Sequence, residues 1–347
     1  MRQRVLFRVD SGAALGAGHL VRCLALAQQF AEEGAQVAFV CRPLPGALLD
    51  LPKQANYVVH VLPDSVQMLE DDAHETARFA KQWQATLLVV DHYGLDARWE
   101  GVLQETVGVV LAIDDLANRP HVCQWLLDQN DCRPESGRYV PWVPADARLL
   151  LGPRFALLRP EFRAARSRCA PRNGQLQRLV VFFSGSDESN ETAKALHGLV
   201  LLGPPPWQVD VVIGAAHPDA AGIAALCAQN GWQLHCQVPY MADLLATADL
   251  SLGSAGSASW ERCVLGVPAL VVELAENQRE VIHALQQHGC VKVLGEAWQL
   301  APQHYAEALQ ALRSDELATM SLAAWGWIDA DGARRVVQSV LETMNEP

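Results

Sequence analysis

The chain of 347 residues is long enough for two domains of ordinary size, each with its own hydrophobic core. Half of its residues are hydrophobic and 19% are charged, which is the composition of a globular protein rather than a disordered one. The formal net charge of −12 argues against sequence-independent nucleic-acid binding, which needs a basic surface. An anionic ligand is not excluded, because a helix N-terminus can hold a phosphate group on an acidic protein.

The cysteines and the apolar runs indicate the cellular compartment of the protein. The nine cysteines form no Cys-x-x-Cys pair, and the first residues enter a strand-like run without an apolar signal segment. No apolar run approaches the ~20 residues that span a bilayer. We therefore expect reduced thiols in a cytoplasmic protein with no stable membrane association.

Short apolar runs alternate with helical patterns through the first 115 residues. Continuous apolar runs of this length are typical of a parallel sheet covered by helices on both faces. Residues 131–177 are rich in Pro and Arg and predict an interdomain connection, with one more short strand at 149–151. The expected strands are residues 5–9, 37–40, 57–62, 87–90 and 109–113, and the expected helices are 20–33, 69–83 and 97–105.

The alternation resumes in the second half. Its expected strands are residues 179–183, 209–213, 233–238, 250–252 and 269–274, and its expected helices are 191–202, 220–229, 241–246, 259–265 and 279–287. Residues beyond 295 are expected to be helical. The whole pattern predicts an α/β fold of two halves facing each other across a cleft. Residues 1–150 would form the N-terminal domain, 151–177 a linker, and 178–347 the second domain with the C-terminal helices.

The turn at residues 16–19 joins an apolar run to an amphipathic helix and ends in His19. Such a βα turn lies at the carboxyl edge of a sheet, where open α/β proteins bind ligands. Histidine provides a base near neutral pH, Asp10 would orient its ring, and Arg22 would hold an anionic group. The alternative is a tight glycine turn with His19 capping the helix. The neighbouring charged residues, including Arg8, favour the functional interpretation modestly.

Carboxylates follow two further expected strands, in Asp91-His92-Tyr93 and in Asp114-Asp115. At adjacent strand ends they would position a ligand or a catalytic histidine. The alternative is that Asp91 and Asp115 are N-caps of the following segments, and both interpretations stay open. Although His92 and His121 lie nearby, no ligand set has a recognisable metal spacing, so we expect no metal site.

Residues 182–190 take an apolar run into small hydrogen-bonding residues before the next helix. This repeats the first βα turn at the start of the second half, and it suits a phosphate or hydroxyl ligand. An ordinary Ser/Asp helix cap explains the same residues equally well.

Residues 253–259 are a second run of small residues ahead of a helix, and residues 276–278 follow the next strand. The N–H groups of the run would bind a diphosphate, while Glu261 would accept hydrogen bonds from sugar hydroxyls. No nucleoside triphosphatase P-loop pattern is present. A merely flexible turn is the less favoured alternative, because three features converge over a short stretch.

Seven motifs occur in chain order up to about residue 290: Arg8-x-Asp10, Gly16-Ala17-Gly18-His19-x-x-Arg22, Asp91-His92-Tyr93, Asp114-Asp115, Gly185-Ser186-Asp187, Trp260-Glu261-Arg262-Cys263 and Asn277-Gln278. Together they resemble the hydrolase family of pseudaminic acid biosynthesis known as PseG. That family is similar in fold to the GT-B glycosyltransferases of the MurG type. The resemblance therefore implies two Rossmann-like domains facing a cleft.

The resemblance also implies an activity. The family hydrolyses UDP-2,4-diacetamido-2,4,6-trideoxy-β-L-altropyranose to UDP and the free sugar, with inversion and without a metal or other cofactor. His19 matches the family's general base, and Glu261 and Asn277 match its substrate-binding positions. We place the UDP diphosphate on the turns of the second half. The remaining expected substrate contacts are Arg8, Asp10, Gly16, Gly18, Arg22, Asp91, His92, Tyr93, Gly185, Ser186, Asn190, Gly256, Ser257 and Gln278.

The chain departs from the family pattern at Ser184, where the first glycine of a Gly-Gly pair is expected. The residues beyond 295 carry no motif and are expected to brace the two halves. Two other functions stay open: a GT-B transferase that passes the sugar of a UDP donor to an acceptor, and a non-catalytic sugar-nucleotide sensor. The sugar stereochemistry and the oligomeric state are also open, a monomer being allowed.

Overall fold

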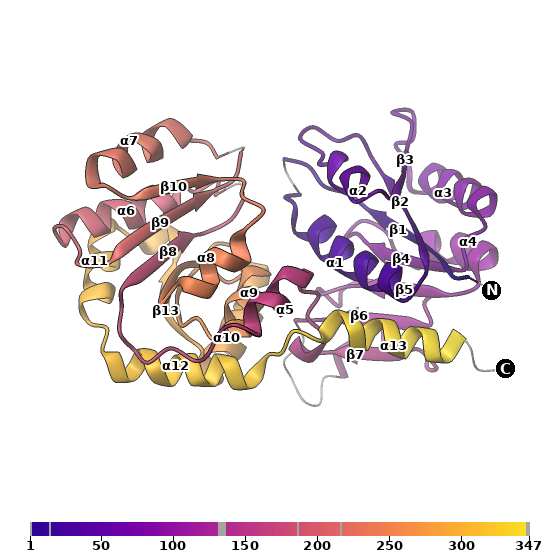
Figure 1. The fold of residues 1–347 in the computed structure, drawn as a ribbon. Helices are drawn as coiled ribbons and strands as arrows, with labels where there is room; N and C mark the ends of the chain where they lie inside the picture. Colours follow the sequence, from indigo (N-terminus) through magenta and orange to yellow (C-terminus); the bar gives the residue numbers. More distant parts are fainter. Residues whose placement is uncertain (1, 14, 131–136, 186, 216, 345–347) are drawn as a thin grey trace. The chain divides into compact units, whose positions relative to one another are not determined.

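The chain folds into two compact units in the computed structural model, which describes residues 2–13, 15–130, 137–185, 187–215 and 217–344. The first unit comprises Met1–Arg159 and Asp331–Pro347, and the second comprises Pro160–Ala330. Each unit is built on one parallel sheet with helices around it (Figure 1). The predicted α/β class is thus confirmed. No helix in the described ranges has the length and apolar character needed to cross a bilayer.

The sheet of the first unit has seven strands in the order β3-β2-β1-β4-β5-β6-β7. The strands are β1 (Arg4–Val9), β2 (Gln36–Cys41), β3 (Val58–Val61), β4 (Leu87–Asp91), β5 (Val110–Ile113), β6 (Trp125–Asp128) and β7 (Arg148–Leu151). The helices are α1 (Gly18–Glu32), α2 (Asp50–Gln54), α3 (Leu69–Trp83), α4 (Ala97–Val107) and α13 (Gly332–Met344), with short 3₁₀ turns η1 (Gly137–Tyr139) and η2 (Pro153–Phe155).

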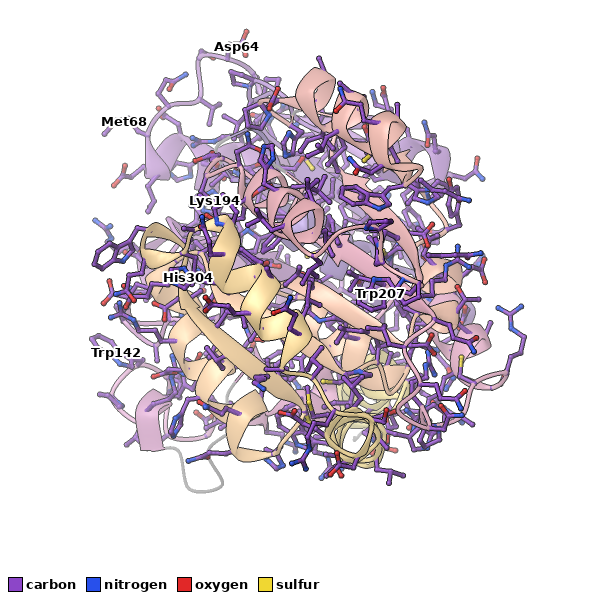
Figure 2. The ribbon with its side chains drawn as sticks, turned by 90° about the vertical axis from the view of Figure 1, so that its left-hand side faces the viewer. Asp64, Met68, Trp142, Lys194, Trp207 and His304 are labelled. Atoms are coloured by element: carbon purple, nitrogen blue, oxygen red, sulfur yellow. The ribbon has the colours of Figure 1, made fainter. Side chains whose placement is uncertain are left out.

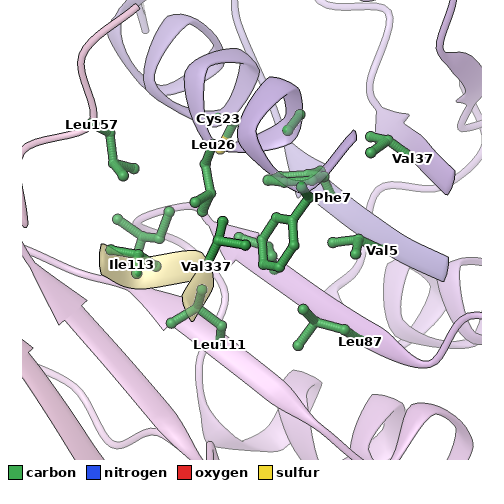
Figure 3. Close-up of a cluster of buried hydrophobic side chains, with 14 of the residues drawn as sticks. Val5, Phe7, Cys23, Leu26, Val37, Leu87, Leu111, Ile113, Leu157 and Val337 are labelled. Atoms are coloured by element: carbon green, nitrogen blue, oxygen red, sulfur yellow. The ribbon is translucent and has the colours of Figure 1, made fainter. Parts of the chain in front are cut away.

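The strand β1 is buried on both faces, which explains why its sequence is apolar apart from Arg4 and Arg8. Val5 and Phe7 belong to the core on one side, with residues of α1 and α13. Leu6 belongs to the core on the other side, with residues of α3 and α4. Figure 3 shows the first of these cores, with the Phe7 ring among Leu26 of α1 and Val337 of α13.

The sheet of the second unit has six strands in the order β10-β9-β8-β11-β12-β13. The strands are β8 (Arg178–Phe182), β9 (Gln208–Ile213), β10 (Gln233–Cys236), β11 (Leu250–Ser254), β12 (Ala269–Glu273) and β13 (Val291–Glu296). The helices are α5 (Pro160–Arg166), α6 (Glu191–Leu201), α7 (Ala220–Asn230), α8 (Met241–Thr247), α9 (Ala258–Val264), α10 (Arg279–Gln287), α11 (Pro302–Gln310) and α12 (Ser314–Trp327), with 3₁₀ turns η3 (Glu276–Gln278) and η4 (Ala297–Gln299).

The helices α6 and α11 pack side by side in the second unit. Figure 2 labels one residue on each, Lys194 on α6 and His304 on α11. Lys194 also donates a hydrogen bond to the carbonyl of Ala297 in η4 (3.0 Å), so it ties α6 to the segment that leads into α11. This packing fixes the helix that begins directly after the β8 turn.

Both sheets contain a point where the chain reverses its direction of winding. In the first unit the chain runs outward from β1 to β3 and then crosses back to β4 on the other side of β1. In the second unit the same reversal separates β8 from β11. Open α/β sheets bind ligands at the carboxyl ends of the strands beside such a point. The turns after β1, β4, β8 and β11 are therefore the places to look for a site.

The domain boundaries differ from the sequence prediction at two places. The expected linker, 151–177, contains η2 of the first unit and α5, which packs against α8 in the second. The last helix, α13, was expected in the second domain but lies along β6 and β7 of the first unit (Figure 1). Its residues Val336, Val337 and Val340 are buried in the core of that unit. Burial of this apolar stripe assigns α13 to the first unit.

Candidate active site

The turn that leads to His19 has an open backbone. Gly16 adopts a φ of +72°, a conformation that L side chains rarely take, and its N–H donates to the carbonyl of Gly12 (2.8 Å). A Cβ atom at Gly16 or at Gly18 would meet no atom within 4 Å. Since α1 begins at Gly18, this opening also lies beside the first amide groups of a 15-residue helix. A ligand can therefore approach the backbone closely beside His19.

The imidazole of His19 is half-buried and packs edge-on against the ring of Tyr93, with centroids 4.7 Å apart and planes at 89°. No residue in the described ranges hydrogen-bonds to its ring nitrogens. Burial lowers the pKa of His19 below 6.5, against the opposing effect of the Asp91 carboxylate. At neutral pH the ring is thus uncharged and keeps a nitrogen lone pair for accepting a proton.

Arg22 is bound by two carboxylates one turn further along α1. Its guanidinium donates to both Asp91 oxygens (2.6 and 2.7 Å) and to Asp115 (3.0 Å), and the residue is only 6% exposed. The predicted role of holding an anionic ligand group is therefore wrong in this geometry, because the charge is already neutralised. Arg22 instead joins α1 to the ends of β4 and β5.

Asp114 and Asp115 have different roles. Asp114 accepts hydrogen bonds from the backbone N–H groups of Leu116 and Ala117, so it caps the turn after β5. Asp115 accepts one hydrogen bond from Arg22 and Asp91 accepts two. Neither caps a helix, because α4 is capped by Asp96 and β5 is followed by the strand β6, which contradicts the N-cap interpretation for both residues. Within the described ranges, the second oxygen of Asp115 is buried without a hydrogen-bond partner. Burial and the Asp115 charge raise the pKa of Tyr93.

Arg8 is completely buried and cannot touch a ligand, which corrects its predicted role as a substrate contact. Its guanidinium donates to both oxygens of Asp10 (2.6 and 3.0 Å) and to both oxygens of Asp72 (3.1 and 2.7 Å). Asp72 comes from α3, where sequence reasoning did not single it out. It also accepts a hydrogen bond from the Trp99 indole (2.9 Å). Asp72 could have been recognised in the sequence, because it is a carboxylate on the apolar side of an amphipathic helix.

His92 and Asp10 form a hydrogen-bonded pair across β1 and β4. The Nδ1 atom of His92 accepts the N–H of Gly94 (3.0 Å), so the neutral ring carries its proton on Nε2 and donates to Asp10 (3.2 Å). Burial alone would raise the pKa of Asp10, but His92 and the Arg8 charge hold it well below its usual range. The His92 side chain remains 21% exposed, so it can contact a ligand at this edge.

The turn after β8 in the second unit is organised by Asp187. Its carboxylate accepts the N–H groups of Glu191 and Thr192 (3.0 and 2.9 Å), which are the first amides of α6. It also accepts a hydrogen bond from Nε2 of His217 (3.2 Å). The helix-cap alternative for this turn is thus present in the structure. Ser186, a predicted substrate contact, lies outside the described residues.

Two other residues of this turn remain open to a ligand. Asn190 adopts a φ of +53°, and among the described atoms its buried Oδ1 has no hydrogen-bond partner. A Cβ on Gly185 would meet nothing within 4 Å. The carbonyl of Gly185 is crowded from behind, because a Cβ on Gly214 would lie only 1.8 Å from it. The turn is therefore packed tightly on its inner side and open on its outer side.

The turn after β11 lies at the same sheet edge, because β11 is the neighbour of β8. The N–H groups of Gly256 and Ser257 donate to no acceptor in the described part of the chain. The helix that follows, α9, has only seven residues and carries Glu261. Asn277 is exposed in η3 after the neighbouring β12, and Gln278 accepts the N–H of Leu274 (3.1 Å). The predicted residues of the second unit thus share one edge.

Part of the chain is similar in sequence to a known hydrolase. No family model matches the chain. The chain is 33% identical over 160 residues to the UDP-2,4-diacetamido-2,4,6-trideoxy-β-L-altropyranose hydrolase of Campylobacter jejuni, covering 46% of this chain and 53% of that protein. The matched part is thus about half the length of that hydrolase.

Solved structures match over nearly the whole chain. MurG of Acinetobacter baumannii is 16% identical with a TM-score of 0.68, covering 98% of this chain and 99% of MurG. Spinosyn forosaminyltransferase SpnP is 15% identical with a TM-score of 0.66, and both chains are covered completely. At these identities the likeness establishes the fold. The chain therefore has the GT-B fold of two Rossmann-like units, and over 160 residues its sequence is similar to that of the altropyranose hydrolase.

Proposed function

We propose that the protein hydrolyses a UDP-linked sugar, with His19 as the general base and UDP as a product. The substrate we propose is UDP-2,4-diacetamido-2,4,6-trideoxy-β-L-altropyranose of pseudaminic acid biosynthesis, the compound that the similar Campylobacter protein is named for. The observation that carries the proposal is His19 itself. It is uncharged at neutral pH, has no hydrogen-bond partner in the described ranges, and lies at the strand ends where this fold binds ligands.

The proposed reaction has one bond-forming and one bond-breaking event at the anomeric carbon. The oxygen of a water molecule forms a bond to that carbon while the water gives a proton to His19. The bond from the carbon to the diphosphate oxygen breaks, and its electron pair leaves with UDP. Attack from the side opposite to UDP inverts the configuration of the carbon. Tyr93 would hold the His19 ring in place through the edge-on contact.

The second unit would bind the nucleotide. In this proposal the turns at Gly185 and at Gly256–Ser257 receive the diphosphate, since their backbone is open and the Gly256 and Ser257 amides have no acceptor in the described part of the chain. Amide donors aimed at the leaving diphosphate stabilise the charge that develops on it. Glu261 and Asn277 would bind hydroxyl groups of the substrate. No metal or other cofactor enters the proposed step.

The variant His19→Asn tests this function. We expect kcat for UDP release to fall by about 10²–10⁴-fold, the usual contribution of a positioned general base, while the Kd for UDP stays the same. UDP release is measured without any acceptor, and binding is measured by calorimetry. His283→Asn, at an exposed position on α10, is the matched control and should leave turnover unchanged. Undiminished turnover of His19→Asn would contradict the proposed mechanism.

Glycosyl transfer is a second candidate, because a solved structure of similar fold is a forosaminyltransferase. The same assay separates the two activities, since a transferase needs an acceptor for rapid release of UDP. A non-catalytic sensor would bind UDP without any turnover. A panel of UDP- and CMP-linked diacetamido sugars, assayed for nucleotide release, would identify the sugar that the protein accepts.

A further inference from the structure

Arg262 is a buried arginine directly behind the turn that follows β11. The residue is 2% exposed and belongs to the short helix α9. Its Nη2 atom donates to the carbonyl of Ser254, the last residue of β11 (2.6 Å), and to the hydroxyl of Ser259 in α9 (3.0 Å). The guanidinium thus connects the two ends of the turn at residues 254–259.

The neighbouring carboxylate of Glu261 offsets only part of the effect of burial on the Arg262 charge. Among the described residues, none places a carboxylate oxygen within ion-pair distance of its guanidinium. The two other buried arginines discussed above differ in this respect, since Arg8 and Arg22 each bind two aspartates. Burial lowers the pKa of Arg262 to about 10, whereas the carboxylates outweigh burial and raise the pKa of Arg8 and Arg22. Buried charges are almost always paired, so a counter-charge is missing here.

The backbone around Arg262 is built to admit the guanidinium at the ligand-binding edge. A Cβ on Gly253 would lie 3.2 Å from Nη1 of Arg262 and 1.9 Å from the carbonyl oxygen of Phe182 at the end of β8. Any residue larger than glycine at position 253 would therefore push apart β8, β11 and the arginine. The charge consequently sits between the two strands where the second sheet reverses its winding.

The orientation of the turn follows from the Arg262 hydrogen bond. In a trans peptide the N–H of a residue points opposite to the preceding carbonyl. Because the Ser254 carbonyl points towards Arg262, the N–H of Ala255 points away from it. The next two amides, of Gly256 and Ser257, have no acceptor in the described part of the chain. Two successive donors, the amides of Gly256 and Ser257, are thus held in a turn that has the positive charge of Arg262 behind it.

We propose that Arg262 is a positioning residue for a diphosphate group, which binds on the outer side of the turn at residues 254–259 and supplies the missing counter-charge. The identity of the nucleotide as UDP rests on the function proposed above, but the role of Arg262 toward the diphosphate does not. A helix of seven residues provides little dipole for an anion. The arginine compensates with a whole charge in a medium of low dielectric constant, where its attraction is weakly screened.

The test compares ligands with and without phosphate on the full chain. Binding of UDP, uridine and inorganic diphosphate is measured by calorimetry for the wild type, Arg262→Met and Arg262→Lys. We expect Arg262→Met to weaken UDP and diphosphate by about tenfold or more and uridine by less than about twofold. Arg262→Lys keeps the positive charge but lacks the planar guanidinium group. We therefore expect it to lose less diphosphate affinity than Arg262→Met does. Thermal unfolding confirms that each variant is folded.

The control variant is Arg178→Met, since Arg178 lies at the opposite end of β8 and is paired with Asp210 (2.6 Å). It should leave the affinities for all three ligands unchanged. Equal losses for UDP and uridine in Arg262→Met, or no loss for diphosphate, would overturn the role of Arg262. If the wild type binds diphosphate but not UDP or uridine, the proposed UDP-sugar substrate is wrong. The effect of Arg262→Met on diphosphate affinity still tests the role of Arg262 in that case.

Discussion

The surroundings of His19 determine how the proposed activity depends on pH. Burial disfavours the protonated ring, so the pKa of His19 lies below 6.5 and the base stays available as the pH falls towards that value. We therefore expect the acid limb of kcat/KM to have its midpoint below pH 6.5 and activity to be lost only as His19 becomes protonated. Rates between pH 4.5 and 8, with an NMR titration of the His19 ring, measure this midpoint. A midpoint above 6.5 in both experiments would show that the ring gains a proton more easily than its burial implies.

Arg8 supports the site through stability rather than contact. The variant Arg8→Met leaves Asp10 and Asp72 buried without their counter-charge, and we expect the free energy of unfolding to fall by about 3–5 kcal/mol. Urea denaturation measures the loss. The matched control is Arg98→Met, which breaks the exposed pair with Asp96 and should cost less than about 1 kcal/mol. Equal losses in the two variants would contradict the structural role of Arg8.

Single residues were predicted well where the local sequence decides their place. His19 is expected at the start of a helix after a strand, and α1 places it there. The partners of Arg8 and Arg22 were missed because Asp72 and Asp115 lie 64 and 93 positions away. Sequence periodicity predicts which helix or strand carries a charged residue. The oppositely charged residue with which it pairs is determined by the fold.

Among the elements, the continuous apolar runs were predicted most reliably. The strands β1, β2 and β4 are buried along nearly their whole length, so their sequences are mainly apolar, with Arg8 and Asp91 as buried charged exceptions. The strands β6 and β13 were missed. The strand β13 is only partly buried and its pairing with β12 contains an irregularity, so its sequence lacks the continuous apolar run of the central strands. Local pattern therefore specified the edge strands β3, β7 and β10 as well as the central strands, and failed at the interior strand β6 and the edge strand β13.

The tight inner side of the β8 turn gives a prediction for that element. The variant Gly214→Ala places a methyl group 1.8 Å from the Gly185 carbonyl, so the turn must shift. We expect a loss of about 1–3 kcal/mol in stability, with weaker UDP binding. Denaturation and calorimetry provide the measurements. The control Gly326→Ala lies in α12 with open space around it and should stabilise by about 0.5–1 kcal/mol. Unchanged UDP affinity in Gly214→Ala would separate this turn from the nucleotide site.

At the level of the whole molecule, α13 completes the first unit although it follows the second in sequence. Deleting residues 331–347 uncovers the core residues that contact Val336, Val337 and Val340, each worth about 1.5–3 kcal/mol of apolar burial. We expect the first unit to lose its protection against hydrogen exchange while Pro160–Ala330 keeps it. Exchange measured by mass spectrometry on full-length and shortened chains distinguishes the units. Uniform loss across both would show that they unfold as one.

The sequence predicted α13 as a helix but assigned it to the wrong unit. Its apolar stripe shows that one face must be covered, and the stripe is compatible with either core. Which of the two cores α13 covers is determined by the path of the chain, which returns to the first unit at Asp331. The fold of each half was thus accessible from local patterns, whereas the interleaved connection of the two was not.

This interleaving has a consequence for biosynthesis. On the ribosome, the first 159 residues emerge early, but the helix that closes their core follows only after about 170 further residues. At 5–20 residues per second, the nascent first unit waits roughly 10–30 s with an apolar surface uncovered. Pro160–Ala330 forms a contiguous stretch and can fold during that interval. We therefore expect the half of the protein that carries His19 to mature last, and to be the half more exposed to chaperones and proteases during synthesis.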